Sequence, residues 1–287
     1  MTFALLIGLL WLTLVKATPM IYAALGGTLS ERSGVINIGL EGMMTAGAFS
    51  AAVASFYTGQ PLIALAVGIL GGALIGWLLG FVATRFKVDQ IVAGMGLNIL
   101  CLGAAAYGLM LLFNQPGASP QVASMGENYR WLVWLAPVLA VAMQWFLWST
   151  PWGLRVRACG ENPKAVAAAG LNPLAIRLMA VTCSGALAGL AGAFLAVGEL
   201  NLYSDGMTAG RGFIALAAII FGRWTPIGAF AACLLFGFLQ ALQIELQGHI
   251  TWLPTDLFEA LPYVAALIAL VGATGRNKAP AADGVPY

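Results

Sequence analysis

The chain has 287 residues, of which 61% are hydrophobic and 8% are charged, with 13 basic and 11 acidic side chains. Soluble domains carry about 25% charged residues, so this chain cannot cover a water-exposed surface of its size. The composition excludes a globular cytoplasmic enzyme and a disordered chain, and a net charge of +2 gives no indication of a polyanionic partner.

Eight apolar runs are long enough to form helices that cross or nearly cross a bilayer, which needs about 20 apolar residues. They are Phe3–Leu29, Asn37–Tyr57, Pro61–Phe86, Gln90–Phe113, Trp131–Ser149, Arg177–Val197, Ile227–Leu246 and Leu257–Val271. A further piece, Gly212–Gly222, is predicted to be a half-span or part of a broken helix, because it reaches only about 16 Å. We expect an all-α polytopic bundle of about 8–9 transmembrane or partly spanning helices.

Lys and Arg residues set the expected orientation, because positive charge is retained on the cytoplasmic side. With the N-terminus outside and the C-terminus inside, Arg85, Lys87, Arg155 and Lys164 all lie in cytoplasmic loops. Residues 1–275 then form a single transmembrane domain with a cytoplasmic loop at 150–176. The tail 276–287, composed largely of Gly, Ala and Pro, is expected to be disordered.

Small residues recur along two of the predicted spans. Gly68, Gly72, Gly76 and Gly80 form one ridge, and Ser184, Ala188 and Gly192 form another beside Gly185 and Gly189. Helices in lipid associate through close backbone contact, so these ridges predict a tightly packed bundle.

The first of the stretches that place polar groups within the membrane-spanning runs, where their burial costs free energy, is 30–44. Asn37 and Glu41 are four residues apart and are predicted to share one helix face. Glu41 lies about one turn inside a span, where a carboxylate should face the bundle or water. The alternatives are a gate, a structural tie to Arg32, or a polar cluster near the lipid headgroups.

Two further stretches place polar groups inside the bundle. Asn98 lies deep in the fourth run and either joins helices or contacts a ligand. The stretch 202–213 is rich in glycine and polar residues, and it either lines a cavity as irregular backbone or is a surface loop. The candidate substrate-path residues are Asn37, Glu41, Asn98, Ser204, Asp205, Gly210 and Phe213.

The cytoplasmic loop contains signals for a short helix. Asn162 is a favourable N-cap, Pro163 suits the first helical position, and Gly170 followed by Pro173 stops the helix. A plain linker would not need both start and stop signals. The small, apolar surface of this helix predicts a docking site for another protein.

Several chemistries have no residues to support them. The chain has one histidine, His249, and its four cysteines form no CxxC pair, so we expect no metal site and no catalytic residues. No lysine follows a glycine, so no phosphate-binding loop is present, and ATP would have to be bound by another chain. An intramembrane enzyme is disfavoured. A membrane protein that depends on an ATPase in another chain and a facilitative transporter that works alone remain alternatives.

Three stretches resemble permease subunits of bacterial ABC importers in the ribose and branched-chain amino-acid permease superfamily, nucleoside-type branch. They are ATPMIYAALGGTLSERSGVINIGLEGMMTAGAF, GLRVRACGENPKAVAAAGLNPLAIRLMAVTCSGALAGLAGAFLAV and GMTAGRGFIALAAIIFGRWTPIGAFAACLLFG. The resemblance implies a multi-pass protein of the plasma membrane that moves nucleosides by alternating access. Simple sugars such as ribose are the alternative substrates.

The resemblance also implies partners. A separate ATPase would bind ATP and Mg²⁺, a paralogous permease would complete the pore as a heterodimer, and a periplasmic or lipid-anchored protein would deliver substrate. The ATPase would dock on a coupling helix that spans Gly160–Gly170. Its candidate coupling residues are Gly160, Glu161, Asn162, Pro163, Ala165, Ala168 and Gly170.

Overall fold

The computed structural model describes residues 3–249, 264, 279–285 and 287. In chain order, its helices are α1 (Phe3–Arg32), α2 (Leu40–Thr58), α3 (Pro61–Arg85), α4 (Gln90–Phe113), η1 (Gly126–Tyr129), α5 (Arg130–Ser149), α6 (Pro151–Glu161), α7 (Pro163–Ala168), α8 (Pro173–Ala193), η2 (Phe194–Glu199), α9 (Arg211–Phe221) and α10 (Pro226–His249). The element η1 is a 3-10 turn and η2 is a π-helix. No strand occurs within these ranges, which confirms the all-α class.

Within the described residues, six helices are long and apolar enough to cross a membrane. They are Leu6–Arg32, Pro61–Arg85, Gln90–Phe113, Arg130–Ser149, Pro173–Glu199 and Pro226–Gln247. α9 is a shorter apolar helix of 11 residues, as expected for the piece Gly212–Gly222. The total of 8–9 helices stays a prediction, and the run Leu257–Val271 lies outside the described residues.

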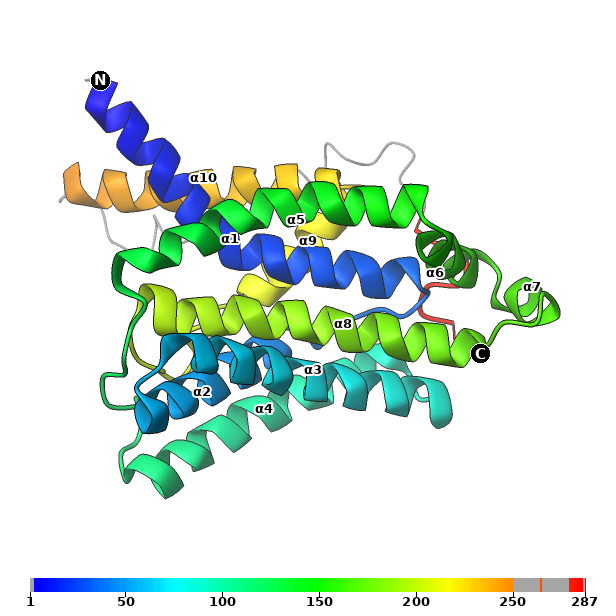
Figure 1. The fold of residues 1–287 in the computed structure, drawn as a ribbon, viewed down its shortest axis with the longest axis horizontal. Coiled ribbons are helices and arrows are strands. Elements are labelled where there is room, and N and C mark those ends of the chain that lie inside the picture. The colour runs from blue at the N-terminus through cyan, green and yellow to red at the C-terminus, as the bar shows by residue number, and fades with distance from the viewer. Residues whose placement is uncertain (1–2, 250–263, 265–278, 286) are drawn as a thin grey trace.

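The long helices lie side by side, with α8 among α1, α2 and α3 and with α6 and α7 at one end (Figure 1). In the most apolar stretch of the span that contains α8, 78% of the residues are buried, compared with 28% in the corresponding stretches of α5 and α10. α8 is therefore the central helix, whereas α5 and α10 present much of their surface outward.

Glycine ridges bring α8 into backbone contact with α3, as predicted from the small-residue pattern. A Cβ added at Gly72 would overlap the carbonyl oxygen of Gly185, and one at Gly185 would overlap that of Gly72. A Cβ at Gly76 would lie 2.6 Å from the carbonyl oxygen of Val181. Because Cβ atoms would separate these backbones, only glycine permits this approach.

Small residues bring α8 close to α2 and α1 in the same way. A Cβ at Gly192 would overlap the carbonyl oxygen of Met44 in α2, and a Cβ at Gly26 in α1 would lie 2.6 Å from that of Ser184. α8 thus holds three neighbouring helices through backbone contact. The packed bundle also positions the two non-helical segments that precede α2 and α9.

Candidate functional site

Two helices begin inside the bundle instead of at its ends. α2 begins at Leu40 after the non-helical segment 33–39, in which Ser33 and Asn37 have no exposed surface. α9 begins at Arg211 after the turns of 204–210, and Gly212 in its first turn is buried. The main-chain N–H and C=O groups of irregular backbone inside a membrane need hydrogen-bond partners within the protein. The residues that supply these partners form the candidate site.

One face of α4 supplies partners to the segment 33–39. Gln90 Oε1 accepts a hydrogen bond from the N–H of Ile36 (2.8 Å), and Asn98 Nδ2 donates to the carbonyl oxygen of Ile38 (3.0 Å). Asn98 Oδ1 also accepts from the N–H of Gly42 in the first turn of α2 (2.7 Å). Asn98 therefore joins α4 to the helix break, which is the first of the two roles predicted for this residue.

Asn37 lies before α2, so the prediction that Asn37 and Glu41 share a helix face is wrong. The chain leaves the helical conformation at Gly34, whose φ is +91°, and resumes it only at Leu40. Asn37 Nδ2 donates to Ser184 Oγ on α8 (2.9 Å). Its buried Oδ1 has no hydrogen-bond partner within the described ranges, so this amide retains one open acceptor.

Glu41 joins the two helix breaks. Its Oε1 accepts from the N–H of Gly210 (2.8 Å) and its Oε2 from the N–H of Gly212 (2.6 Å), at the start of α9. The first N–H groups of a helix have no partner within it and carry partial positive charge, so a carboxylate is well matched to them. The suggested tie to Arg32 is wrong, because Arg32 Nε donates to the carbonyl oxygen of Trp224 (2.6 Å).

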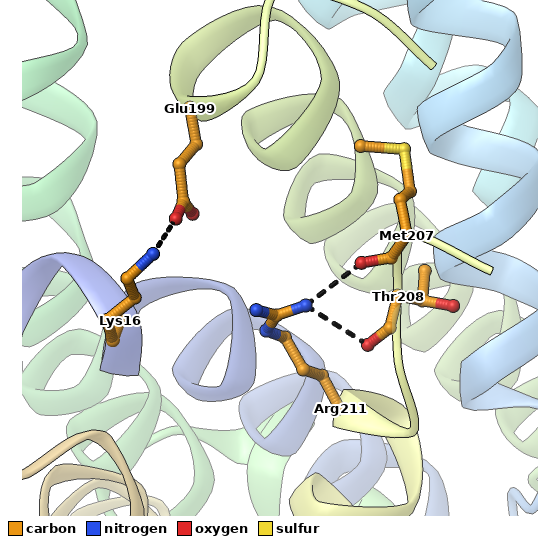
Figure 2. Close-up of polar contacts among 5 residues, drawn as sticks. All are labelled: Lys16, Glu199, Met207, Thr208 and Arg211. Atoms are coloured by element: carbon orange, nitrogen blue, oxygen red, sulfur yellow. Dashed lines mark hydrogen bonds and ion pairs between the residues drawn. The ribbon is translucent and has the colours of Figure 1, made fainter. Parts of the chain in front are cut away.

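Charged side chains gather near the start of α9 (Figure 2). Arg211 Nη1 donates to the carbonyl oxygens of Met207 (2.9 Å) and Thr208 (3.4 Å), and Lys16 of α1 forms an ion pair with Glu199 at the end of η2. Lys16 and Glu199 are 183 residues apart in the sequence, so no local pattern indicates that they pair. Glu199 Oε2 and Arg211 Nε are buried and have no partner among the residues described.

Three other candidate path residues lie farther along the chain. Ser204 forms an isolated antiparallel bridge with Ala118, and the N–H of Asp205 donates to the carbonyl oxygen of Gly117 (2.8 Å). The side chains of Asp205 and of Phe213 on α9 are exposed. The structure therefore brings Asn98, Glu41 and Gly210 together through α2, whereas Asp205 belongs to a neighbouring loop.

The predicted short helix is confirmed as α7. Asn162 Oδ1 accepts from the N–H of Ala165 (3.1 Å), Pro163 is its first residue, and Gly170 has a left-handed φ of +80°. The N–H groups of Gly170 and Leu171 donate to carbonyl oxygens in the last turn, which completes the helix end.

A second helix, α6, precedes α7 and was not predicted. Thr150 accepts from the N–H of Gly153 (3.1 Å), and Pro151 is the first helical residue. This threonine-proline pair is itself a helix-start signal that could have revealed α6. α6 and α7 form a hairpin, defined here as residues 151–168, at one end of the bundle (Figure 1).

One side of the hairpin packs against the bundle, and the other side is exposed. Val166 is buried in an apolar cluster with Val156 of α6 and Ile176 of α8. Ala165 and Ala168 on α7 are exposed. The fold therefore fixes α7 through one side chain and presents small side chains outward.

Long apolar helices, breaks whose backbone is satisfied by neighbouring helices and a capped hairpin at one end define a multi-pass membrane transport protein. Residues 9–270 match the family described as branched-chain amino acid transport system / permease component, and the chain belongs to this family. It is thus the permease component of an ABC transporter in the bacterial inner membrane, and ATP hydrolysis lies in a separate subunit. Such a permease works with an ATPase and a substrate-binding partner.

Three relatives align along most of this chain. It is 38% identical to the guanosine ABC transporter permease protein NupQ of Bacillus subtilis, over 96% of this chain and 94% of the relative. It is 37% identical to the nucleoside ABC transporter permease protein NupC of Lactococcus lactis, with the same coverage. A second Bacillus subtilis permease for guanosine, NupP, is 26% identical over 94% of this chain and 85% of its own length.

Proposed function

We propose that this chain is a permease subunit of an ATP-driven importer that moves nucleosides across the plasma membrane by alternating access. The observation that carries the proposal is the identity of 38% and 37% to a guanosine and a nucleoside permease over 96% of the chain. A nucleoside is neutral, with a flat base and a polar ribose. Open amide and charged groups near the helix breaks can form hydrogen bonds with the polar groups of such a ligand.

The hairpin is the proposed docking site for the ATPase. Gly160, Glu161, Asn162, Pro163, Ala165, Ala168 and Gly170 form or flank α7. Because α7 exposes Ala165 and Ala168 and is anchored through Val166, a partner can approach it closely while its movement is passed to the bundle. ATP and Mg²⁺ are bound by that partner in this proposal.

The proposed orientation places the hairpin in the cytoplasm, with the N-terminus outside and the C-terminus inside. Positive charge supports this orientation, since Arg155, Arg157 and Lys164 all lie on the hairpin. The opposite arrangement would require these groups to be translocated across the membrane.

The proposed substrate path passes the two helix breaks. Asn37, Glu41 and Gly210 lie at the breaks, and Asn98 of α4 bonds to the first of them. Ser204 and Asp205 precede α9, and Phe213 lies in its first turn. Broken helices in transporters present free backbone and polar groups near the middle of the membrane. Glu41 links the breaks, so a shift of α9 relative to α2 would change what both expose.

The complete importer in this proposal contains two different permeases. Bacillus subtilis has two guanosine permease proteins that match this chain at 38% and 26% identity, which supports a heterodimer over a homodimer. A periplasmic or lipid-anchored binding protein would deliver the substrate.

Uptake by the reconstituted complex tests the proposal. Liposomes containing both permeases, the ATPase and the binding protein should accumulate labelled guanosine with saturation and only with ATP, and excess ribose should not compete. Uptake of ribose without uptake of nucleosides would favour a sugar permease. Nucleoside uptake by this chain alone, without ATP, would contradict the proposal in favour of a facilitative transporter.

A further inference from the structure

A single arginine joins three parts of the molecule at the hairpin end. Arg177, in the second turn of α8, is 1% exposed. Its Nε donates to the carbonyl oxygen of Ser33 (3.2 Å), its Nη2 to that of Ala282 (3.2 Å), and its Nη1 to that of Val285 (2.9 Å). The guanidinium therefore connects α8, the start of the α2 break and the segment 279–285.

The segment 279–285 also holds the hairpin. The N–H of Ala282 donates to the carbonyl oxygen of Gly160 (2.8 Å), and the N–H of Ala281 lies 3.4 Å from Glu161 Oε2. Gly160 packs so closely on the end of α1 that an added Cβ would overlap the carbonyl oxygen of Arg32. Gly160 and Glu161 are the last residues of α6, directly before the cap of α7.

The same segment contacts the non-helical residues before α2. A Cβ at Gly34 would lie 2.6 Å from Arg177 Nη2 and 3.1 Å from the carbonyl oxygen of Ala282. A Cβ at Gly284 would lie 2.7 Å from Ile36 Cδ1. One short segment of the tail that was expected to be disordered is thus in contact with both the hairpin and the helix break.

We propose that residues 279–285 form a clasp, held by Arg177 as a positioning residue, that links the hairpin to the break before α2. The inference rests on the proposed docking of an ATPase on α7. When α7 moves, the clasp carries the movement to segment 33–39, which contains Asn37 and leads directly into the first turn of α2, where Glu41 lies. Without the clasp, ATP hydrolysis continues but is poorly converted into transport.

This role follows from where the contacts are made. α6 is joined to the clasp by the main-chain hydrogen bond from Ala282 to Gly160, and segment 33–39 is joined to it by Arg177 and by the close approach of Gly34 to the carbonyl oxygen of Ala282, which leave little freedom to slide. Arg177 has carbonyl oxygens as acceptors on two different segments, so its burial is stabilised only while both are in place. A moving hairpin must therefore carry the clasp or break these bonds.

The test compares two variants and a control in the full complex. In one variant residues 279–287 are removed. In the other, Ala282→Pro deletes the N–H that binds Gly160 and retains the carbonyl that binds Arg177. Val285→Ser is the control, because the Val285 side chain is 52% exposed and only its carbonyl oxygen contacts Arg177. Permease abundance, co-purified ATPase, ATP hydrolysis and nucleoside uptake are measured together.

We expect both variants to keep the ATPase bound and to hydrolyse ATP, while uptake per ATP falls about tenfold or more and the control is unchanged. Unchanged uptake per ATP in both variants would overturn the proposal. Loss of permease abundance in both variants would also overturn it, because the clasp would then serve folding alone. If the unaltered complex takes up no nucleoside or binds no ATPase, the proposed function itself fails, independently of the clasp.

Discussion

Glu41 caps α9 from another helix, since its Oε2 accepts a hydrogen bond from the N–H of Gly212 at 2.6 Å. Its second oxygen accepts from the N–H of Gly210, so one carboxylate satisfies two main-chain donors at the start of α9. The interaction joins α2 to α9 across 171 residues of sequence. Both helices begin inside the bundle, so this bond sets their relative position.

Replacing Glu41 should therefore disturb both stability and transport. Glu41→Ala leaves the buried N–H of Gly212 unpaired, at a cost of about 1–3 kcal/mol, and removes the partner of the part-buried N–H of Gly210. Glu41→Gln keeps one acceptor oxygen, and we expect an intermediate loss. Thermal unfolding in detergent and nucleoside uptake measure the two effects.

Thr58→Ala on the same helix is the control for Glu41, because the hydrogen bonds of this exposed hydroxyl are local, to the carbonyl oxygen of Ala54 and from the N–H of Gln60. If Glu41→Ala transports normally and melts at the same temperature as Thr58→Ala, the bond to α9 contributes nothing to either property.

A charge on α7 should uncouple the transporter without unfolding it. Ala168 is exposed, so Ala168→Glu is tolerated by this chain, but it would bury an unpaired carboxylate against a docked ATPase at a cost of several kcal/mol. We expect normal membrane abundance, weaker co-purification of the ATPase and loss of uptake. Gln121→Glu, on an exposed loop between α4 and α5, is the control. Normal co-purification and uptake by Ala168→Glu would remove α7 as the docking site.

Stability should depend on glycine at position 72, where α3 packs against α8, and not on glycine at position 96 of α4. Gly72→Ala forces apart two backbones in contact, and we expect a loss of about 1–3 kcal/mol, as for overpacked cores. Gly96→Ala on α4 is the matched control, because no atom lies within 4 Å of the added Cβ. The control should be neutral or stabilised, by up to about 1 kcal/mol. Equal melting temperatures for the two variants would contradict this account of the ridge.

Docking of the clasp should weaken as pH rises. Burial raises the pKa of Asp283 to about 7, although Arg177 and a hydrogen bond from the N–H of Gly284 both act to lower it. The carboxylate of Glu31 on α1 also lies near Asp283. Docking then takes up a proton between the ordinary pKa of 3.8 and about 7, so the clasp is docked about tenfold more tightly at pH 6 than at pH 8.

Maleimide labelling of Ala282→Cys measures this pH effect, in a background without the native cysteines, because Ala282 is buried only while the clasp is docked. The thiol itself reacts faster at high pH, so the rates are compared with those of the same protein carrying Asp283→Asn. Removing the carboxyl should abolish the additional pH dependence. The same rate ratio with and without Asp283 would refute the prediction.

The orientation can be tested with two exposed positions. In the same cysteine-free background, Ala169→Cys should react with a membrane-impermeant reagent only from the cytoplasm, and Gln121→Cys only from outside. Both residues are exposed, so a lack of reaction from one side reports the membrane and not burial. The reverse pattern would invert the topology.

The sequence by itself determined the properties that depend on composition or on near neighbours. An excess of apolar residues requires lipid as solvent, whatever the fold. Asn162, Pro163 and Gly170 specify α7 because each bond of a helix cap joins residues only a few positions apart. Regular glycine spacing likewise predicts a ridge, and Gly72 and Gly185 do bring α3 against α8.

Only the tertiary structure decided which distant groups meet. Asn37 was expected on a helix, but Gln90 and Asn98 of α4 bond to the non-helical backbone around it, and these bonds compensate for the lost helical ones. Lys16 and Glu199, like Glu41 and Gly212, find each other across the bundle because helix packing places them together. No local pattern encodes such pairs, since each polar group in lipid accepts whichever partner the packed helices bring within reach.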